Sequence, residues 1–130
     1  MNMSEFLLWL IEQTPVTQWK YLFPVDVLST KKTIAIYGAG AVGKDYYVQA
    51  EASNVCEVVA WVDQRYEELR KMGYPVVPPK TLKELQCDCI LFAFENEGLA
   101  NRVMQLLLSQ GIPEEKMLWI KPRTNFLENK

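Results

Sequence analysis

Residues 33–43 read TIAIYGAGAVG, and this apolar run followed at once by a glycine-rich turn decides the fold. Its β-branched and apolar residues predict a buried strand over 33–37. A helix is predicted from 41 to about 53, because apolar side chains recur there at a four-residue spacing on one face, namely Val42, Tyr46 and Ala50. The stretch is therefore a strand, a tight turn and a helix in direct succession.

Strand and helix signals continue to alternate beyond this stretch. Apolar runs predict buried strands over 58–62, 89–94 and 117–120, and Val76 with Val77 can form a short edge strand or extended segment between prolines. Short connections between these elements imply right-handed crossovers and a parallel sheet. We therefore predict an α/β protein with a three-layer α/β/α Rossmann-like fold, whose parallel sheet of about five strands has the order 3-2-1-4-5.

Two more helices are predicted in the second half of the chain. Thr81 and Glu84 have the spacing of a capping box, which predicts a brief helix through Leu85. A longer helix over 97–110 is expected to end at Gly111, because glycine readily adopts the left-handed conformation found after helices. The face that this helix is expected to bury consists of Leu99, Val103, Leu106 and Leu107.

Residues 1–32 are predicted to be a helical N-terminal extension of a domain formed by residues 33–130. Ser4 can cap a short helix within 1–13, and the stretch that follows is unusually aromatic. This segment is either a helical pad on the sheet or an oligomer contact, because aromatic residues are enriched in interface cores. We expect a homodimer through residues 1–28, whose aromatic side chains lie outside the strand and helix alternation: Trp9, Trp19, Tyr21 and Phe23.

Composition narrows the classes of partner. The formal charge is −2, with 14 basic and 16 acidic residues, which argues against a nucleic-acid surface. The apolar run 6–11 is too short for a signal peptide, and no segment approaches the ~20 apolar residues that span a bilayer. We expect a cytoplasmic protein that binds neither nucleic acid nor a membrane.

Cysteine and histidine content narrows the chemistry. The chain has three cysteines, Cys56, Cys87 and Cys89, without the spacing of a metal or redox motif, and it has no histidine. We expect the cysteines to be packing residues and no metal to be bound. Hydrolases of the Ser-His or Cys-His kind are excluded, because the commonest catalytic base is absent.

The glycine turn predicts a phosphate-binding site. Gly38 permits the tight turn, Gly40 lets a pyrophosphate approach the backbone, and Gly43 lets the helix and strand pack closely. The free N–H groups and the positive dipole end of the helix then face the phosphates. The residues assigned to this cofactor-binding turn are Gly38, Ala39, Gly40, Ala41, Val42 and Gly43.

Asp63 and Arg65 are assigned to the same site. Asp63 follows the second predicted strand, where its carboxylate can accept hydrogen bonds from ribose hydroxyls. An acid in this place repels a 2′-phosphate, whereas the neighbouring Arg65 could accept one. NAD is therefore favoured over NADP, and the ribose of another nucleotide remains an alternative.

Two nearby features are ambiguous. Residues 38–44 also match the beginning of a P-loop, but Asp45 stands where magnesium binding needs a hydroxyl, so a P-loop is rejected. Lys44 either helps to neutralise a phosphate or is a solvated surface lysine. The loop Glu95-Asn96-Glu97 borders the expected crevice, where its carboxylates either bind sugar hydroxyls or favour the start of the next helix.

These motifs resemble those of the compact Rossmann-like modules found in bacterial surface-polysaccharide and nucleotide-sugar enzymes. The resemblance covers about residues 33–120 and implies a glycan-related module that binds NAD or a UDP-sugar, often as one part of a larger protein. The acidic loop at Glu95 departs from the family pattern. The stretches that carry the resemblance are IYGAGAVGK at 36–44, AWVD at 60–63, PVVPP at 75–79, DCILF at 88–92 and GIPEEK at 111–116.

No residue is assigned as catalytic, and three functions stay open. The first is a nucleotide-binding module, for NAD or a nucleotide-sugar, that serves a glycan-modifying enzyme without catalysing a reaction alone. The second is an NAD-dependent oxidoreductase that is complete only as an oligomer. The third is an interaction module with an emptied pocket.

Overall fold

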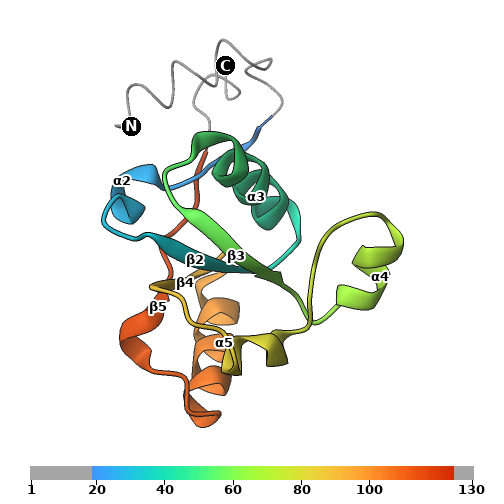
Figure 1. Ribbon diagram of the computed structural model, residues 1–130, viewed down its shortest axis with the longest axis vertical. Helices are drawn as coiled ribbons and strands as arrows, with labels where there is room; N and C mark the ends of the chain where they lie inside the picture. Colours follow the sequence, from blue (N-terminus) through green and yellow to red (C-terminus); the bar gives the residue numbers. More distant parts are fainter. Residues whose placement is uncertain (1–18, 125–130) are drawn as a thin grey trace.

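The computed structural model describes residues 19–124, which form an α/β fold around a parallel sheet of four strands (Figure 1). The strands follow the order β3-β2-β4-β5 and are β2 (Thr33–Tyr37), β3 (Glu57–Val62), β4 (Cys89–Phe92) and β5 (Met117–Leu118). The helices between them are α3 (Ala41–Ser53), α4 (Tyr66–Lys71), η1 (Pro79–Lys83), α5 (Glu97–Ser109) and η2 (Glu114–Lys116). The α/β class and the parallel pairing are confirmed.

The third of the five predicted strands is reduced to a single bridge. Val77 lies parallel to Val62, its N–H donates to Trp61 O at 2.8 Å, and its carbonyl accepts from Asp63 N at 3.3 Å. Prolines flank this segment on both sides and cannot donate ladder hydrogen bonds. The sheet therefore has four strands rather than about five, and Val77 lies beside β3, where the predicted order placed the third strand.

The two faces of the sheet pack against different helices. Alternate residues of β2 point to opposite sides, so Ile34 and Ile36 pack with α3 while Ala35 and Tyr37 pack with α5. Figure 1 shows α3 and α5 on opposite sides of the strands. The carboxyl ends of β2, β3 and β4 are left facing the starts of these two helices.

The two long helices differ in how well their buried faces were predicted. In α3 the expected residues are buried, and the helix ends at Asn54 in the left-handed conformation (φ 57°). In α5 the expected face is half right, because Val103 and Leu107 are buried whereas Leu99 and Leu106 are 38% and 44% exposed. The side chains that α5 buries are Ala100, Val103 and Leu107.

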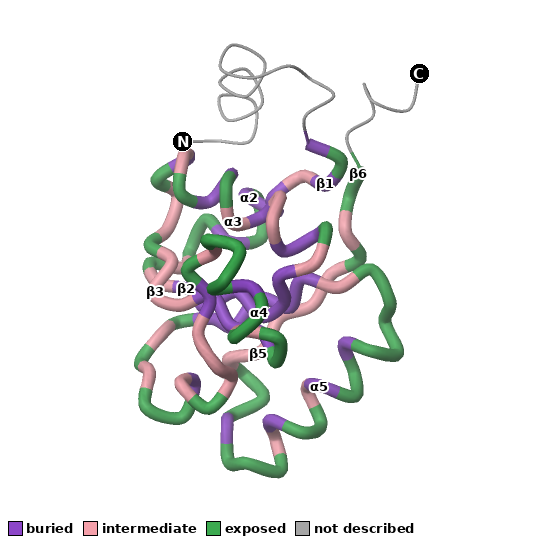
Figure 2. The backbone as a smooth tube through the Cα atoms, turned by 90° about the vertical axis from the view of Figure 1, so that its right-hand side faces the viewer, coloured by how far each residue is buried: buried purple, intermediate pink, exposed green. Residues whose placement is uncertain are grey.

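Two local predictions also need correction. The segment around Thr81 and Glu84 forms the 3-10 helix η1, whose N-cap is Pro78, so the expected capping box is not present. The helix α4 was not predicted at all. Only Leu69 of its six residues is buried, which leaves little apolar periodicity to detect, and Figure 2 shows α4 as mostly exposed.

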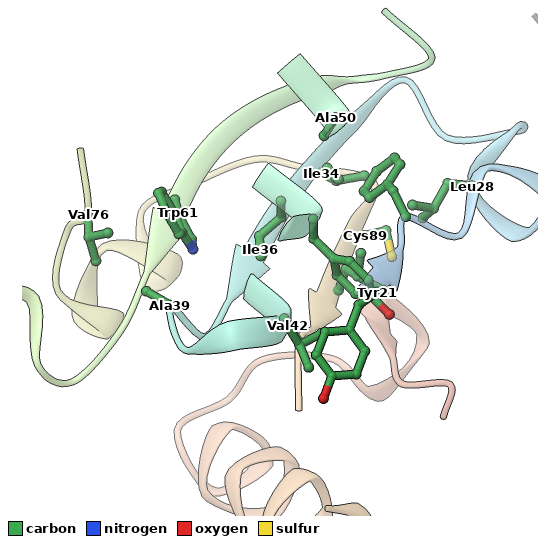
Figure 3. Packing of buried hydrophobic residues seen from close by; sticks show 14 of the residues in the cluster. Tyr21, Leu28, Ile34, Ile36, Ala39, Val42, Ala50, Trp61, Val76 and Cys89 are labelled. Atoms are coloured by element: carbon green, nitrogen blue, oxygen red, sulfur yellow. The ribbon is translucent and has the colours of Figure 1, made fainter. Parts of the chain in front are cut away.

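The segment before the sheet is part of the same core. It contains β1 (Tyr21–Leu22), which pairs antiparallel with β6 (Arg123–Thr124), and α2 (Val25–Leu28). Figure 3 shows Tyr21 and Leu28 packed with residues of β2 and α3. The predicted helix within 1–13, and Trp9, lie outside the described residues. The buried side chains of this segment are Trp19, Tyr21, Phe23, Pro24, Val25 and Leu28.

Side chains of α3 hold this segment in place. The carboxylate oxygen Asp45 Oδ2 accepts from the backbone N–H groups of Lys20 and Tyr21, both at 3.0 Å. One turn later the fully buried Gln49 donates to Tyr21 O at 2.6 Å and accepts from Phe23 N at 3.0 Å. A second copy of the chain is therefore not needed to cover Trp19, Tyr21 and Phe23. Trp9 lies outside the described residues, and the homodimer stays a prediction.

Among residues 19–124, no helix has the length and apolar character required to cross a bilayer.

Candidate functional site

A cleft of about 530 Å³ lies where β2, β3 and β4 end and α3 and α5 begin. One wall is the start of α3, another is the segment after β3, and the third is the loop after β4 together with α5. Its lining residues are Tyr37, Gly40, Ala41, Val42, Asp63, Gln64, Arg65, Ala93, Phe94, Glu95, Asn96, Leu99 and Val103. Five of the eight predicted site residues line it: Gly40, Ala41, Val42, Asp63 and Arg65.

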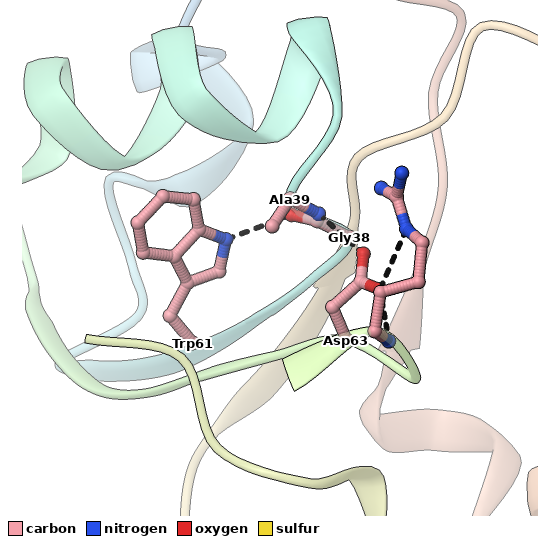
Figure 4. Close-up of polar contacts among 5 residues, drawn as sticks. Gly38, Ala39, Trp61 and Asp63 are labelled. Carbon is pink, nitrogen blue, oxygen red and sulfur yellow. Dashed lines mark hydrogen bonds and ion pairs between the residues drawn. The ribbon is translucent and has the colours of Figure 1, made fainter. Parts of the chain in front are cut away.

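Gly38 and Gly43 shape the turn beneath the cleft. Gly38 has a φ of +117°, and a Cβ there would lie 3.0 Å from Ala93 O. A Cβ on Gly43 would lie 1.9 Å from Gly38 O, so helix and strand can approach this closely only without a side chain. The indole nitrogen Trp61 Nε1 donates to Gly38 O at 2.8 Å (Figure 4). These two glycines are required by packing.

Gly40 has a different environment. A Cβ built there would meet no described heavy atom within 4 Å, although the residue lines the cleft. It is the N-cap of α3 and supplies no side chain to the first helical N–H groups, and the first turn carries no acidic residue. These N–H groups lack partners within the helix, as at every helix start. Packing within residues 19–124 does not explain a glycine at position 40.

Asp63 joins the glycine turn to the end of β3. Its Oδ2 accepts from Ala39 N at 2.8 Å, and its Oδ1 accepts from Arg65 N at 2.7 Å and from Arg65 Nε at 3.3 Å (Figure 4). The residue is 7% exposed and lines the cleft. Because each carboxylate oxygen can accept two hydrogen bonds, a ligand hydroxyl can still donate to Oδ2. Asp63 therefore has a structural role that the sequence did not reveal.

Lys44 and Asp45 lie outside the cleft lining. Lys44 Nζ sits 4.7 Å from the centre of the Tyr74 ring, a cation–π contact. Asp45 binds the backbone of the segment that contains β1. This contact gives a structural reason for the carboxylate that replaces a P-loop hydroxyl.

In the loop Glu95-Asn96-Glu97, some residues start the helix α5 and others line the cleft. Asn96 caps α5 by accepting from Leu99 N at 2.9 Å, and Glu97 lies in the first helical turn. Glu95 and Asn96 line the cleft, whereas Glu97 does not. The charged cleft residues are then the carboxylates Asp63 and Glu95 and the guanidinium of Arg65.

The aromatic side chains at the floor of the cleft were not predicted from the sequence. Tyr37 ends β2, and its ring stacks on Phe92 at 5.6 Å and meets Phe94 edge-on at 5.9 Å. Burial raises the pKa of the Tyr37 phenol, the nearby Gln64 side chain lowers it, and the Asp63 carboxylate raises it again. The only sequence signal for Tyr37 is its place directly before the glycine turn.

The cysteines lie away from the cleft. Burial raises the pKa of Cys56 and of Cys89 to about 11, and it also raises that of Cys87. All three are therefore protonated thiols near neutral pH, a form of low nucleophilicity. Within residues 19–124 no group of three or more His, Cys, Asp or Glu side chains is arranged to hold a metal ion.

No protein-family model matches the chain. A search of curated proteins finds no match either.

Proposed function

We propose that this chain is a nucleotide-binding module of the Rossmann type, which holds the diphosphate of NAD or of a nucleotide-sugar at the Gly38–Gly43 turn. The observation that carries the proposal is the contrast among the three glycines. Gly38 and Gly43 are explained by packing, whereas Gly40 borders open space in the cleft. A bound phosphate approaching the backbone at this point would account for the missing side chain.

The start of α3 supplies the chemistry for an anion. Its 13 residues give a helix long enough to have a positive dipole end, and the first turn contains no carboxylate. Arg65 lines the same cleft and adds one positive charge at the edge. Phosphate oxygens would accept hydrogen bonds from the backbone N–H groups that follow Gly40.

The choice of nucleotide depends on Asp63. Its carboxylate faces the cleft next to the turn, where ribose hydroxyls can donate to it and a 2′-phosphate would be repelled. We therefore place NAD, or a nucleotide with an unmodified ribose, ahead of NADP. The resemblance of the motifs to polysaccharide-biosynthesis modules favours a role in glycan or nucleotide-sugar metabolism.

We propose that the module binds its nucleotide without catalysing a reaction, because the cleft offers few groups that could act as catalysts. Both oxygens of Asp63 already accept hydrogen bonds, and among the described residues lining the cleft, the remaining carboxylate is Glu95 at the exposed rim. An oxidoreductase would need further groups from another subunit. An interaction module with an emptied pocket predicts no nucleotide binding at all, and the following experiment distinguishes it.

We expect NAD or a UDP-sugar at millimolar concentration to raise the melting temperature, since a ligand that binds only the folded state stabilises it. Gly40→Val should weaken that binding at least ~10-fold and lower the melting temperature of the free protein only slightly, because a Cβ at this N-cap meets no described heavy atom within 4 Å. Thermal shift with NAD, NADP, UDP-glucose, CoA and ATP, followed by calorimetric titration, measures both effects.

The matched control is Glu51→Val, which places a valine at an exposed position of α3 outside the cleft lining. This variant should bind like the wild type. Unchanged affinity in Gly40→Val would contradict the glycine-turn site, and no shift with any of the five ligands would support the emptied-pocket alternative.

Asp63→Ala should weaken NAD binding by about 1.5–3 kcal/mol, the range for hydrogen bonds to charged groups, and should narrow the preference over NADP. Stability will also fall, because Ala39 N and Arg65 N lose their acceptor. The informative measurement is therefore the ratio of the NAD and NADP dissociation constants. An equal loss for both cofactors would assign Asp63 a structural role alone.

A further inference from the structure

Two tyrosine hydroxyls in the described part of the chain are buried without a hydrogen-bond partner. They belong to Tyr37 and Tyr46, which are 3% and 1% exposed. A buried hydroxyl that exchanges water for no partner costs free energy, so most such groups in proteins are paired. Each of the two therefore calls for an explanation.

The two hydroxyls lie in different surroundings. Tyr46 is on α3 inside the core, where its ring meets Phe23 edge-on at 5.8 Å, and it does not line the cleft. Burial raises its pKa to about 12. Tyr37 lines the cleft, and so do Gln64, whose side chain interacts with the Tyr37 phenol, and Asp63, whose negative charge acts on it. Of the two, only the Tyr37 hydroxyl lies beside the cleft, where a bound molecule can become its partner after a small shift of the side chains that cover it.

The Tyr37 ring is held in one orientation. Phe92 stacks on it with an interplanar angle of 24°, and Phe94 meets it at 60° from the loop after β4. Packing of this kind leaves the phenol little freedom to turn toward another protein group. A ligand would therefore meet a pre-oriented donor and acceptor.

The surroundings of Tyr37 fit a flat heteroaromatic ring. Apolar side chains from α5 and from the loop after β4 form one wall, and the polar side chain of Gln64 lies near the hydroxyl. Ligand pockets commonly combine such apolar walls with a few polar groups that fix orientation. The apolar lining residues of this part are Ala93, Phe94, Leu99 and Val103.

We infer that Tyr37 is a specificity-determining residue of the cleft, whose hydroxyl hydrogen-bonds the polar edge of the nucleobase of the bound nucleotide. The inference rests on the proposed nucleotide-binding function and names the part of the ligand that the cleft floor recognises. The base lies against the apolar wall, while the diphosphate lies at the glycine turn.

The test compares Tyr37→Phe with Tyr46→Phe, since each removes one buried, unpartnered hydroxyl and nothing else. Dissociation constants are measured by calorimetry for NAD and UDP-glucose, and by NMR titration for the nucleosides adenosine and uridine, which lack a phosphate. Tyr37→Phe should weaken the preferred nucleotide and its nucleoside about 5- to 10-fold, the effect of one lost hydrogen bond. Tyr46→Phe should bind like the wild type, and neither variant should have a lower melting temperature.

The outcomes separate this inference from the glycine-turn proposal. Equal affinity of Tyr37→Phe and wild type, or a fall in the melting temperature of Tyr37→Phe without ligand, overturns the role of Tyr37 and leaves the diphosphate site standing. A different outcome is that Tyr37→Phe weakens nucleoside binding, but NAD and UDP-glucose bind no more tightly than adenosine and uridine. This outcome supports the role of Tyr37 and overturns the diphosphate site at the glycine turn. No binding of any of the four probes at millimolar concentration overturns both.

Discussion

Gly43→Ala is expected to destabilise the protein by about 3 kcal/mol, the upper end of the usual cost of overpacking. Alanine is ordinarily favoured over glycine within a helix by about 1 kcal/mol, so helix propensity alone predicts the opposite sign. The new Cβ would lie 1.9 Å from Gly38 O and 2.6 Å from Gly38 C, which are backbone atoms that cannot rotate away. Urea denaturation measures the free energy of unfolding directly.

Gly40→Ala is the matched control, three residues earlier in the same turn. Its Cβ meets no described atom within 4 Å, so the remaining cost is the poorer N-cap preference of alanine, and the free energy of unfolding should fall by no more than about 1 kcal/mol. Equal stability of the two variants would mean that α3 can move away from the end of β2, contrary to the close approach described above.

Gln49→Met is expected to cost about 2–4 kcal/mol of stability. The substitution keeps the length of the side chain but leaves Tyr21 O and Phe23 N without their buried partner. Each buried backbone group that loses its partner costs about 1–3 kcal/mol. Hydrogen exchange should show faster exchange at Phe23 N, in addition to the lower free energy of unfolding.

Gln105→Met provides the comparison, because Gln105 is an exposed glutamine on α5. Its replacement should change stability by no more than about 0.5 kcal/mol. If Gln49→Met behaved like Gln105→Met, the segment that contains β1 would be held by apolar packing alone.

Prediction from sequence succeeded where the signal was local. The strand, glycine turn and helix from Thr33 to Ser53 follow from spacing within a single stretch, and the structure has them. Asp63 was placed correctly beside the turn, because the carboxyl ends of neighbouring parallel strands meet at one edge of the sheet.

Prediction failed where partners are distant in sequence. Nothing near Tyr21 indicates that it pairs with Thr124, or that Gln49 supplies its polar contact. The buried face of α5 was predicted correctly at Val103 and Leu107 but not at Leu99 and Leu106, and the structure buries Ala100 instead. Tyr37 was overlooked because a strand-end tyrosine is usually explained by packing alone.

The antiparallel pairing of β1 with β6 has a consequence for protein architecture. Tyr21 and Thr124 are register partners, so their Cα atoms are about 5 Å apart, and the described fold is entered and left at nearly the same point. A unit with this geometry can be spliced into a surface loop of a host protein while hardly displacing the two sides of that loop. A circular permutant of the described part, residues 19–124, would likewise need only a short linker between the two ends of that range.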